Sequence, residues 1–201
     1  MAYLWRKQCW AVWLGIGLLA GLMIGGLWPD TPLHAVATDS TDNFAMATGF
    51  VDDGIEAIYF LDFLTGTLRA AVLSNQSRGF QARYEANVNA DLAGVVQLGA
   101  ASLEATNAQR RKAGLPPLPQ LQVPQSPDYM ITTGAVDIRR GAAARAQPAQ
   151  AVLYVAEANT GIVLTYIIPW DRNAHSADIP TGGPLTLWAG DQFTTALIQT
   201  Q

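Results

Sequence analysis

Cysteine and histidine are nearly missing from this sequence, which narrows the chemistry it can perform. The one cysteine among 201 residues is Cys9, inside an apolar N-terminal run, so the rest of the chain has no disulfide, thiol nucleophile or cysteine metal ligand. The two histidines are His34 and His175. Asp171 and Asp178 flank His175 in a polar stretch. We expect a solvated loop there, with a metal site as the alternative.

Charged side chains are also scarce. They make up 14% of the chain, compared with about 25% in typical soluble domains, and the net charge is −4. No stretch is basic enough to follow a phosphate backbone, which argues against nucleic acid as a partner. A glycine-rich phosphate cradle, G-x-S-x-G, H-E-x-x-H and an EF-hand loop are all missing from the sequence. We therefore expect no cofactor and no metal ion.

Residues 9–28 form an uncharged, mostly apolar run, which as a helix would cross the roughly 30 Å hydrocarbon core of a bilayer. Arg6 and Lys7 precede the run and Asp30 follows it, so the positive-inside bias places the N-terminus in the cytoplasm. The sequence predicts a transmembrane anchor over 1–28, which contacts the lipid bilayer through 9–28, and a tether over 29–43. The expected location is the bacterial inner membrane, single-pass, with the C-terminal domain in the periplasm.

A cleaved signal peptide is the alternative interpretation of the same segment. Ala35-Val36-Ala37 has the small-x-small form that cleavage after Ala37 requires, and cleavage would release a secreted protein. The apolar part of a signal peptide is usually about 7–15 residues long, shorter than the run here, which favours the anchor.

Three glycines of this segment fall at four-residue spacing, Gly17, Gly21 and Gly25. On a helix they share one face, where small residues let two backbones approach closely. This predicts a helix–helix contact and a homo-oligomer. The alternative is that glycine is simply common in membrane helices.

The chain downstream uses one pattern twice, at 56–73 and at 151–168. In each copy an apolar, β-branched and aromatic run is followed by Thr-Gly and a second such run, which is typical of a β-hairpin. Thr65-Gly66 matches Thr160-Gly161, Tyr59 matches Tyr154, and Asp62 matches Glu157. The repeat begins earlier, since 44–52 resembles 129–137.

These patterns predict a mainly β fold of two pseudo-repeated antiparallel β-meanders behind an N-terminal transmembrane helix. The exported β-repeat domain spans 44–201: repeat one over 44–92, a short helix and a proline-rich linker over 93–127, and repeat two over 128–201. A lone hairpin is marginal in water, so the two repeats are expected to bury their apolar faces together. We expect a polar loop over 169–184, and two strands around a turn at 189–191.

The matched turns are expected to be structural. Gly66 and Gly161 supply the positive φ of a hairpin loop, and the carboxylates of Asp62 and Glu157 can accept hydrogen bonds from turn N–H groups. The alternative is hydrolysis by a pair of carboxylates, either these two or Asp52 with Asp137.

Loop residues Phe63 and Leu64 are apolar, which suggests that the first turn is covered. The other half of the chain, another subunit or the lipid surface would cover it.

The run Tyr59–Gly66, Tyr-x-x-Asp-x-x-Thr-Gly, resembles the strand-turn-strand core of quinoprotein-type β-propeller blades, such as those of outer-membrane-assembly and alcohol-dehydrogenase propellers. The second copy has Glu157 in place of the aspartate, and neither copy has the tryptophan that usually follows the turn. A propeller has about 4–8 blades, and this chain supplies two at most, so quinone binding and dehydrogenase activity are not carried over. The whole chain is similar to uncharacterised, membrane-anchored, Thr-Gly-hairpin proteins of some bacteria, a likeness that implies no particular activity.

The sequence therefore predicts a non-enzymatic, membrane-anchored β-repeat module that acts in protein interaction or envelope assembly. Its expected partners are another copy of the chain or an unidentified envelope protein. One alternative is a small-molecule or polysaccharide binder, with Tyr59, Tyr154 and Trp188 near a cleft. The other is the carboxylate-based hydrolase.

Overall fold

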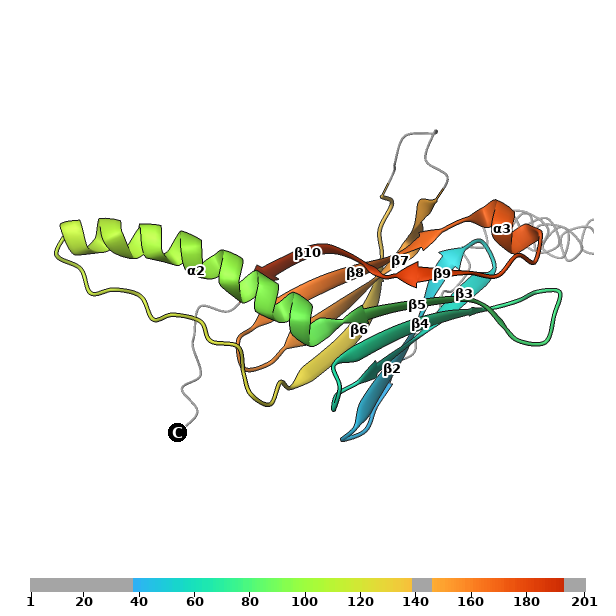
Figure 1. The fold of residues 1–201 in the computed structure, drawn as a ribbon, viewed down its shortest axis with the longest axis horizontal. Helices are drawn as coiled ribbons and strands as arrows, with labels where there is room; N and C mark the ends of the chain where they lie inside the picture. Colours follow the sequence, from blue (N-terminus) through green and yellow to red (C-terminus); the bar gives the residue numbers. More distant parts are fainter. Residues whose placement is uncertain (1–37, 139–145, 194–201) are drawn as a thin grey trace, which may run out of the picture. The chain divides into compact units, whose positions relative to one another are not determined.

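A computed structural model describes residues 38–138 and 146–193, and all structural statements below concern those residues (Figure 1). The chain divides into two compact units, 1–35 and 36–201, and the fold described is that of the second. The predicted membrane segment 9–28, its glycines Gly17, Gly21 and Gly25, and the cleavage site after Ala37 lie outside the described residues. In the described part, no helix combines the length and the apolarity needed to cross a bilayer.

The first sheet is built around an antiparallel meander of four consecutive strands. A short strand adds to one edge antiparallel to β2, and a strand from late in the chain adds to the other edge parallel to β5. In spatial order the strands are β1 (Thr38–Ser40), β2 (Phe44–Asp52), β3 (Ile55–Asp62), β4 (Thr67–Leu73), β5 (Phe80–Asn87) and β9 (Thr181–Pro184).

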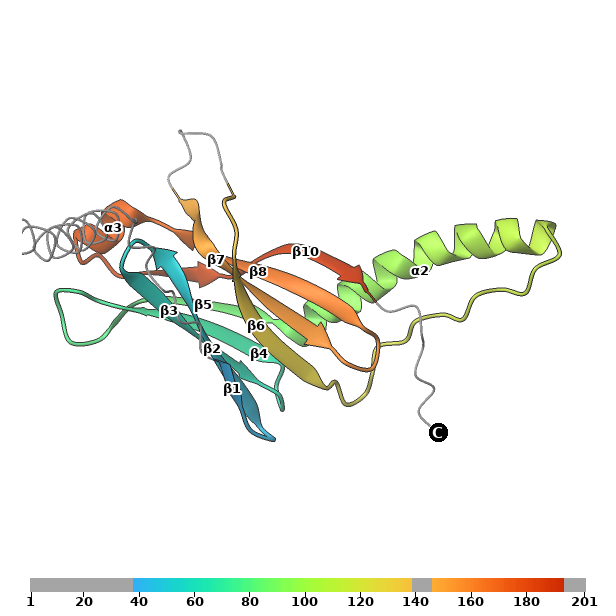
Figure 2. The same cartoon turned by 180° about the vertical axis from the view of Figure 1, so that it is seen from behind.

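The second sheet is antiparallel throughout and repeats the meander. Its strands are β6 (Tyr129–Ala135), β7 (Gln147–Glu157), β8 (Ile162–Trp170) and β10 (Thr186–Gln192), in the order β10-β8-β7-β6. The consecutive strands β9 and β10 belong to different sheets, so residues 181–192 join one edge of the first sheet to one edge of the second. At the other side β2 lies against β6 and β7, as Figure 2 shows.

One hydrophobic core fills the space between the sheets. Because successive residues of a strand point to opposite faces, each strand contributes every second side chain to it. In the first sheet these are small residues of β2, such as Ala45 and Ala47, with Tyr59 and Leu61 of β3. The second sheet contributes larger aliphatic and aromatic side chains, namely Tyr129, Ile131, Leu153, Val155, Ile162, Leu164, Tyr166 and Ile168.

Helix α2 (Val88–Lys112) follows β5 directly. The side chain of Asn87 caps its N-terminus by accepting a hydrogen bond from the N–H of Ala90 at 3.0 Å. Basic residues occupy its last turn, and Gly114 follows with φ of 71°, as is common where helices end. Its first turns pack on the sheets through Val88, Leu92 and Val96, and the rest extends away from them (Figure 1).

The mainly β prediction is confirmed. The helix between the repeats is not short, because it begins at Val88, inside the span assigned to repeat one, and has 25 residues. The expected loop over 169–184 contains a short helix, α3 (Arg172–Ser176), and strand β9. The turn expected at 189–191 is wrong, since β10 runs through those residues with a bulge after Leu187. Part of the expected tether forms β1.

Candidate functional site

The two Thr-Gly turns share one hydrogen-bond pattern. Gly66 donates to the carbonyl of Asp62 at 2.9 Å, and Gly161 donates to the carbonyl of Glu157 at 2.8 Å. The φ angles of the two glycines are 66° and 67°, a left-handed conformation that glycine adopts without steric cost. The carboxylate that starts each turn accepts hydrogen bonds from the backbone N–H groups two and three residues later.

Glu157 is far more deeply enclosed than Asp62. It is 1% exposed, and its carboxylate accepts from the N–H of Asp128, from the N–H and side-chain amide of Asn159, and from the N–H and hydroxyl of Thr160. Burial raises the pKa of Glu157, but these hydrogen bonds outweigh that effect, and the net pKa lies below its usual value. Asp62 lies on the outside, and its equivalent bonds are solvated.

The strand pairing of the two repeats is also the same. Tyr59 lies opposite Ala47, and its counterpart Tyr154 lies opposite Thr132, which corresponds to Ala47. Each tyrosine ring covers a glycine on the neighbouring strand. A Cβ on Gly49 would lie 3.3 Å from the ring of Tyr59, and a Cβ on Gly134 would lie 2.8 Å from the ring of Tyr154.

The two repeats nevertheless bury opposite faces. Tyr59 is 0% exposed and points into the core, whereas Tyr154 is half-buried on the outer face of the second sheet. The carboxylates show the reverse, because Glu157 points into the core and Asp62 points outward. The repeats therefore pack with the Tyr59 face of the first on the Glu157 face of the second.

This packing separates the residues named for the alternative functions. Tyr59 is in the closed core and Tyr154 is on the far face of the other sheet, so they do not line a common cleft with Trp188. Of the candidate carboxylates, Asp62 and Glu157 belong to turns of different sheets.

A polar cluster links β2 to α3. Asp52, 4% exposed, forms an ion pair with Arg172 and accepts from the indole N–H of Trp170 at 3.1 Å. Burial raises the pKa of Asp52, but the hydrogen bonds from Arg172, the Asp53 N–H and Trp170 bring it below its usual value. The carboxylate of Asp52 therefore holds α3 against the end of β2 through Arg172.

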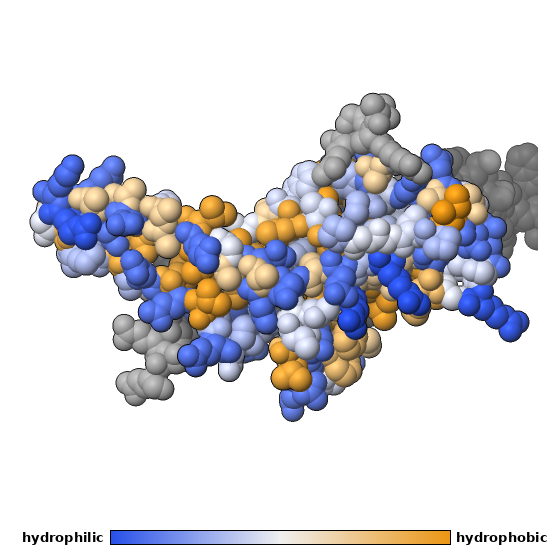
Figure 3. Space-filling view, in the orientation of Figure 1, coloured by the Kyte–Doolittle hydropathy of each residue, from blue (hydrophilic) through white to orange (hydrophobic). Residues whose placement is uncertain are grey.

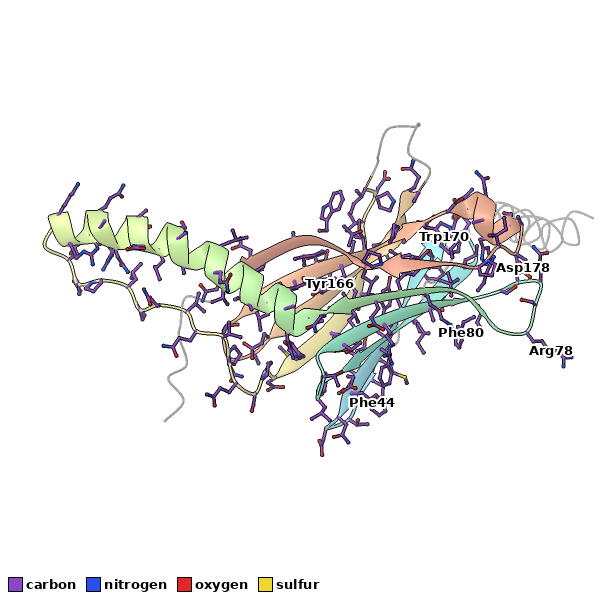
Figure 4. The ribbon with its side chains drawn as sticks, viewed as in Figure 1. Phe44, Arg78, Phe80, Tyr166, Trp170 and Asp178 are labelled. Atoms are coloured by element: carbon purple, nitrogen blue, oxygen red, sulfur yellow. The ribbon has the colours of Figure 1, made fainter. Side chains whose placement is uncertain are left out.

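His175 does not lie in the solvated loop that we expected. It is 4% exposed, and its ring lies 4.9 Å from that of Trp170, which Figure 4 labels. Neither ring nitrogen has a hydrogen-bond partner in the structure. Asp178, the predicted neighbour, instead accepts from the hydroxyl of Ser74 at 2.7 Å. Over residues 38–138 and 146–193, no three His, Cys, Asp or Glu side chains are placed to hold a metal ion.

The first turn is only partly covered. The ring of Phe63 packs against the core, 6.4 Å from the ring of Tyr129, whereas Leu64 at the tip is 90% exposed. The other half of the chain therefore covers Phe63, as one of the expected alternatives held, but not Leu64.

An apolar groove of about 630 Å³, which the sequence analysis did not predict, lies beside α2. One wall is the helix, from Val95 to Thr106, and the floor includes Ile162 of β8 and Gly190 of β10. The opposite wall is the proline-rich segment, through Leu118, Pro119 and Leu121. Figure 3 shows apolar residues gathered along this part of the molecule.

Asn107 holds the groove's two walls together. Its side-chain amide donates to the carbonyl of Leu118 at 2.9 Å and accepts from the N–H of Leu118 at 2.7 Å. Arg110 adds a bond to the carbonyl of Pro116 at 2.9 Å. The linker is thus fastened along α2 as a wall, and Leu98 at the groove is 77% exposed.

Comparison with known proteins provides no assignment for this site. No protein-family model, no curated protein and no solved structure matches the chain.

Proposed function

We propose that this chain is a non-enzymatic interaction module, held by residues 9–28 at the outer face of a bacterial inner membrane, that contributes to envelope assembly by binding a partner protein. The secreted form, cleaved after Ala37, is the alternative location, and the intact mass of the mature chain distinguishes the two. The groove beside α2 is the proposed binding surface, and its occupant is a segment of the partner that presents an apolar face.

The groove is the single observation that carries this proposal. Single exposed apolar residues are normal on a protein surface. A contiguous exposed apolar surface, in contrast, often marks an interaction site. Leu98, Leu103, Leu118 and Leu121 converge on one groove, and Gly99 and Gly190 keep part of its lining free of side-chain bulk. These features fit an apolar helix or extended segment laid into a groove.

The hydrogen bonds and the ion pair of the candidate carboxylates also support an interaction role over hydrolysis. A hydrolase requires two carboxyl groups close to one scissile bond. Here Glu157 is saturated by turn donors and Asp52 is paired with Arg172. Their hydrogen bonds serve the turn and the anchoring of α3.

Site-specific photocrosslinking in intact membranes tests the proposal. A photoreactive amino acid at Leu98, in the groove, is expected to give a discrete heteromeric product. At Gln97, the exposed neighbour that does not line the groove, the product should be absent. Leu98→Glu should abolish copurification of the same partner while the circular dichroism spectrum is unchanged. Equal products at positions 97 and 98, or none at 98, would contradict a groove-bound partner.

A further inference from the structure

The face-to-back packing of the two repeats leaves one apolar face of each uncovered by the other. The internal interface joins two non-equivalent faces, the Tyr59 face of repeat one and the Glu157 face of repeat two. An interface between two non-equivalent faces is heterologous. Because the chain contains only two repeats, one such interface leaves the second face of each repeat without a partner repeat in the same chain.

The uncovered face of repeat one is apolar on β2 and β3. Phe44, Met46, Ile58 and Phe60 lie on it, all half-buried, and the rings of Phe44 and Phe60 stack at 4.9 Å. Figure 4 labels Phe44 at the start of β2. The equivalent residues of repeat two, which fill the internal interface, are Tyr129, Ile131, Leu153 and Val155. Farther along the sheet the face becomes polar, with an ion pair between Arg69 and Glu85.

The uncovered face of repeat two is apolar near its Thr-Gly turn. Met130 is 60% exposed, and Tyr154, Ala156 and Val163 are half-buried. The equivalent residues of repeat one, all buried against repeat two, are Ala45, Tyr59, Leu61 and Leu68. At the other end of this face Val152 and Ile167 are each 1% exposed, which confines the available area to the turn end.

We propose that a second copy of this chain covers these faces, with the Phe44–Phe60 face of one copy packed on the Tyr154 face of the next. The internal interface is the argument for a second copy, because the chain already contains one junction between equivalents of these two faces. Both surfaces of each junction are apolar and carry a tyrosine or phenylalanine ring. Such contacts repeat head to tail and produce a ring or a filament.

The internal junction also predicts one intermolecular neighbour pair. Phe63 of repeat one packs beside Tyr129 of repeat two. The equivalent of Phe63 is Ala158, and the equivalent of Tyr129 is Phe44. Ala158 of one copy should therefore lie beside Phe44 of the next copy. Neither Ala158 nor Phe44 lines the α2 groove, so changes at these two positions leave the groove lining of the proposed partner site unaltered.

Disulfide crosslinking of the full chain in membranes tests this arrangement. Two differently tagged chains, both with Cys9→Ser, carry Phe44→Cys and Ala158→Cys respectively. We expect a crosslinked product only when the two chains are coexpressed, because a heterologous contact brings neither position next to itself. Leu73→Cys, 60% exposed at the other end of the outer strands, is the control for Phe44→Cys and should not crosslink.

Charge placed on either face should disrupt the contact. Phe60→Glu, added to the chain with Phe44→Cys, is expected to lower the yield about tenfold, as loss of a central apolar anchor does. Met130→Glu on the opposite face should do the same, so the test stands if one variant fails to fold. Arg83→Glu, an exposed change on β5, should leave the yield unchanged. Crosslinking of either single variant with itself, or no mixed product in chains of native circular dichroism, would overturn the proposal.

Discussion

Replacing Glu157 with alanine is expected to destabilise the domain by about 3–5 kcal/mol, because it leaves several enclosed donors without an acceptor. The carboxylate holds the N–H groups of Asp128, Asn159 and Thr160 and the hydroxyl of Thr160 at the core end of β7. Water reaches this site poorly, since Glu157 is 1% exposed and Thr160 is 5% exposed. Denaturant unfolding of the full chain in detergent, followed by tryptophan fluorescence, measures the change.

The control is the same change at the equivalent position, Asp62→Ala. Because Asp62 faces solvent, its donors can turn to water, and the expected loss is much smaller than at Glu157. Similar losses at the two positions would show that Glu157 is not enclosed as described.

The contribution of Glu157 to the free energy of unfolding should also depend on pH. Its pKa in the folded state is lowered below 4.5, so its stabilisation is present above the unfolded-state pKa and is lost as the pH falls through the folded-state pKa. The difference between the wild type and Glu157→Gln should therefore be largest near neutral pH and shrink below about pH 4.5. A difference that grows in acid would contradict the assigned direction of the shift.

Replacing Gly49 with alanine is expected to cost about 2–3 kcal/mol, because the added methyl group has no space. A Cβ at this position would lie 2.9 Å from the Cβ of Ala151 and 3.3 Å from side-chain atoms of Thr133 and Tyr59. All three neighbours belong to strands of the packed interior, so relief of the contact requires the sheets to separate. The same unfolding measurement detects the loss.

Gly134→Ala provides the matched control, since Gly134 occupies the same repeat position on the outer face. Its Cβ would meet only the edge of the Tyr154 ring, which is half-buried and can rotate aside. The alanine also reduces the conformational entropy of the unfolded chain, which offsets part of the cost. We expect a change within about 1 kcal/mol. A larger loss at 134 than at 49 would reverse the assignment of inner and outer faces.

The sequence was most informative where the structure is decided locally. Thr65-Gly66 and Thr160-Gly161 predicted the two hairpins because positive φ at one glycine and a carboxylate acceptor suffice to make such a turn. Strand β2 occupies 44–52 as expected, and β6 begins at the expected Tyr129. Pairing register follows from these turns, so it too is the same in both repeats.

The sequence match between the two repeats could not predict which face of each sheet is buried. Matching Tyr59 with Tyr154 aligns backbone pairing, but which side of a sheet is buried depends on what packs against it. Both faces of each repeat carry apolar residues, as Phe60 beside Leu61 and Val152 beside Leu153 illustrate. A pattern that is apolar on both faces does not identify the buried one.

One misassignment and one unpredicted contact near α2 have a common cause in tertiary packing. Gly190 looked like a turn residue, but a Cβ there would lie 2.6 Å from the side chain of Val95, so the glycine allows α2 to approach β10. The proline-rich linker lies along α2 because Asn107 binds both the N–H and the carbonyl of Leu118, a contact that the sequence did not predict. Neither long-range contact has a signature in the local sequence.

Chemical modification of native tyrosines tests the opposite burial of the two repeats most directly. Of the five tyrosines in the described residues, Tyr154 is the one outside the buried set, whereas its counterpart Tyr59 is fully enclosed. Nitration of the folded full chain, mapped by peptide mass spectrometry, should modify Tyr154 rapidly and Tyr59 only after denaturation. Equal nitration of the two residues, or faster nitration of Tyr59, would contradict the face-to-back packing.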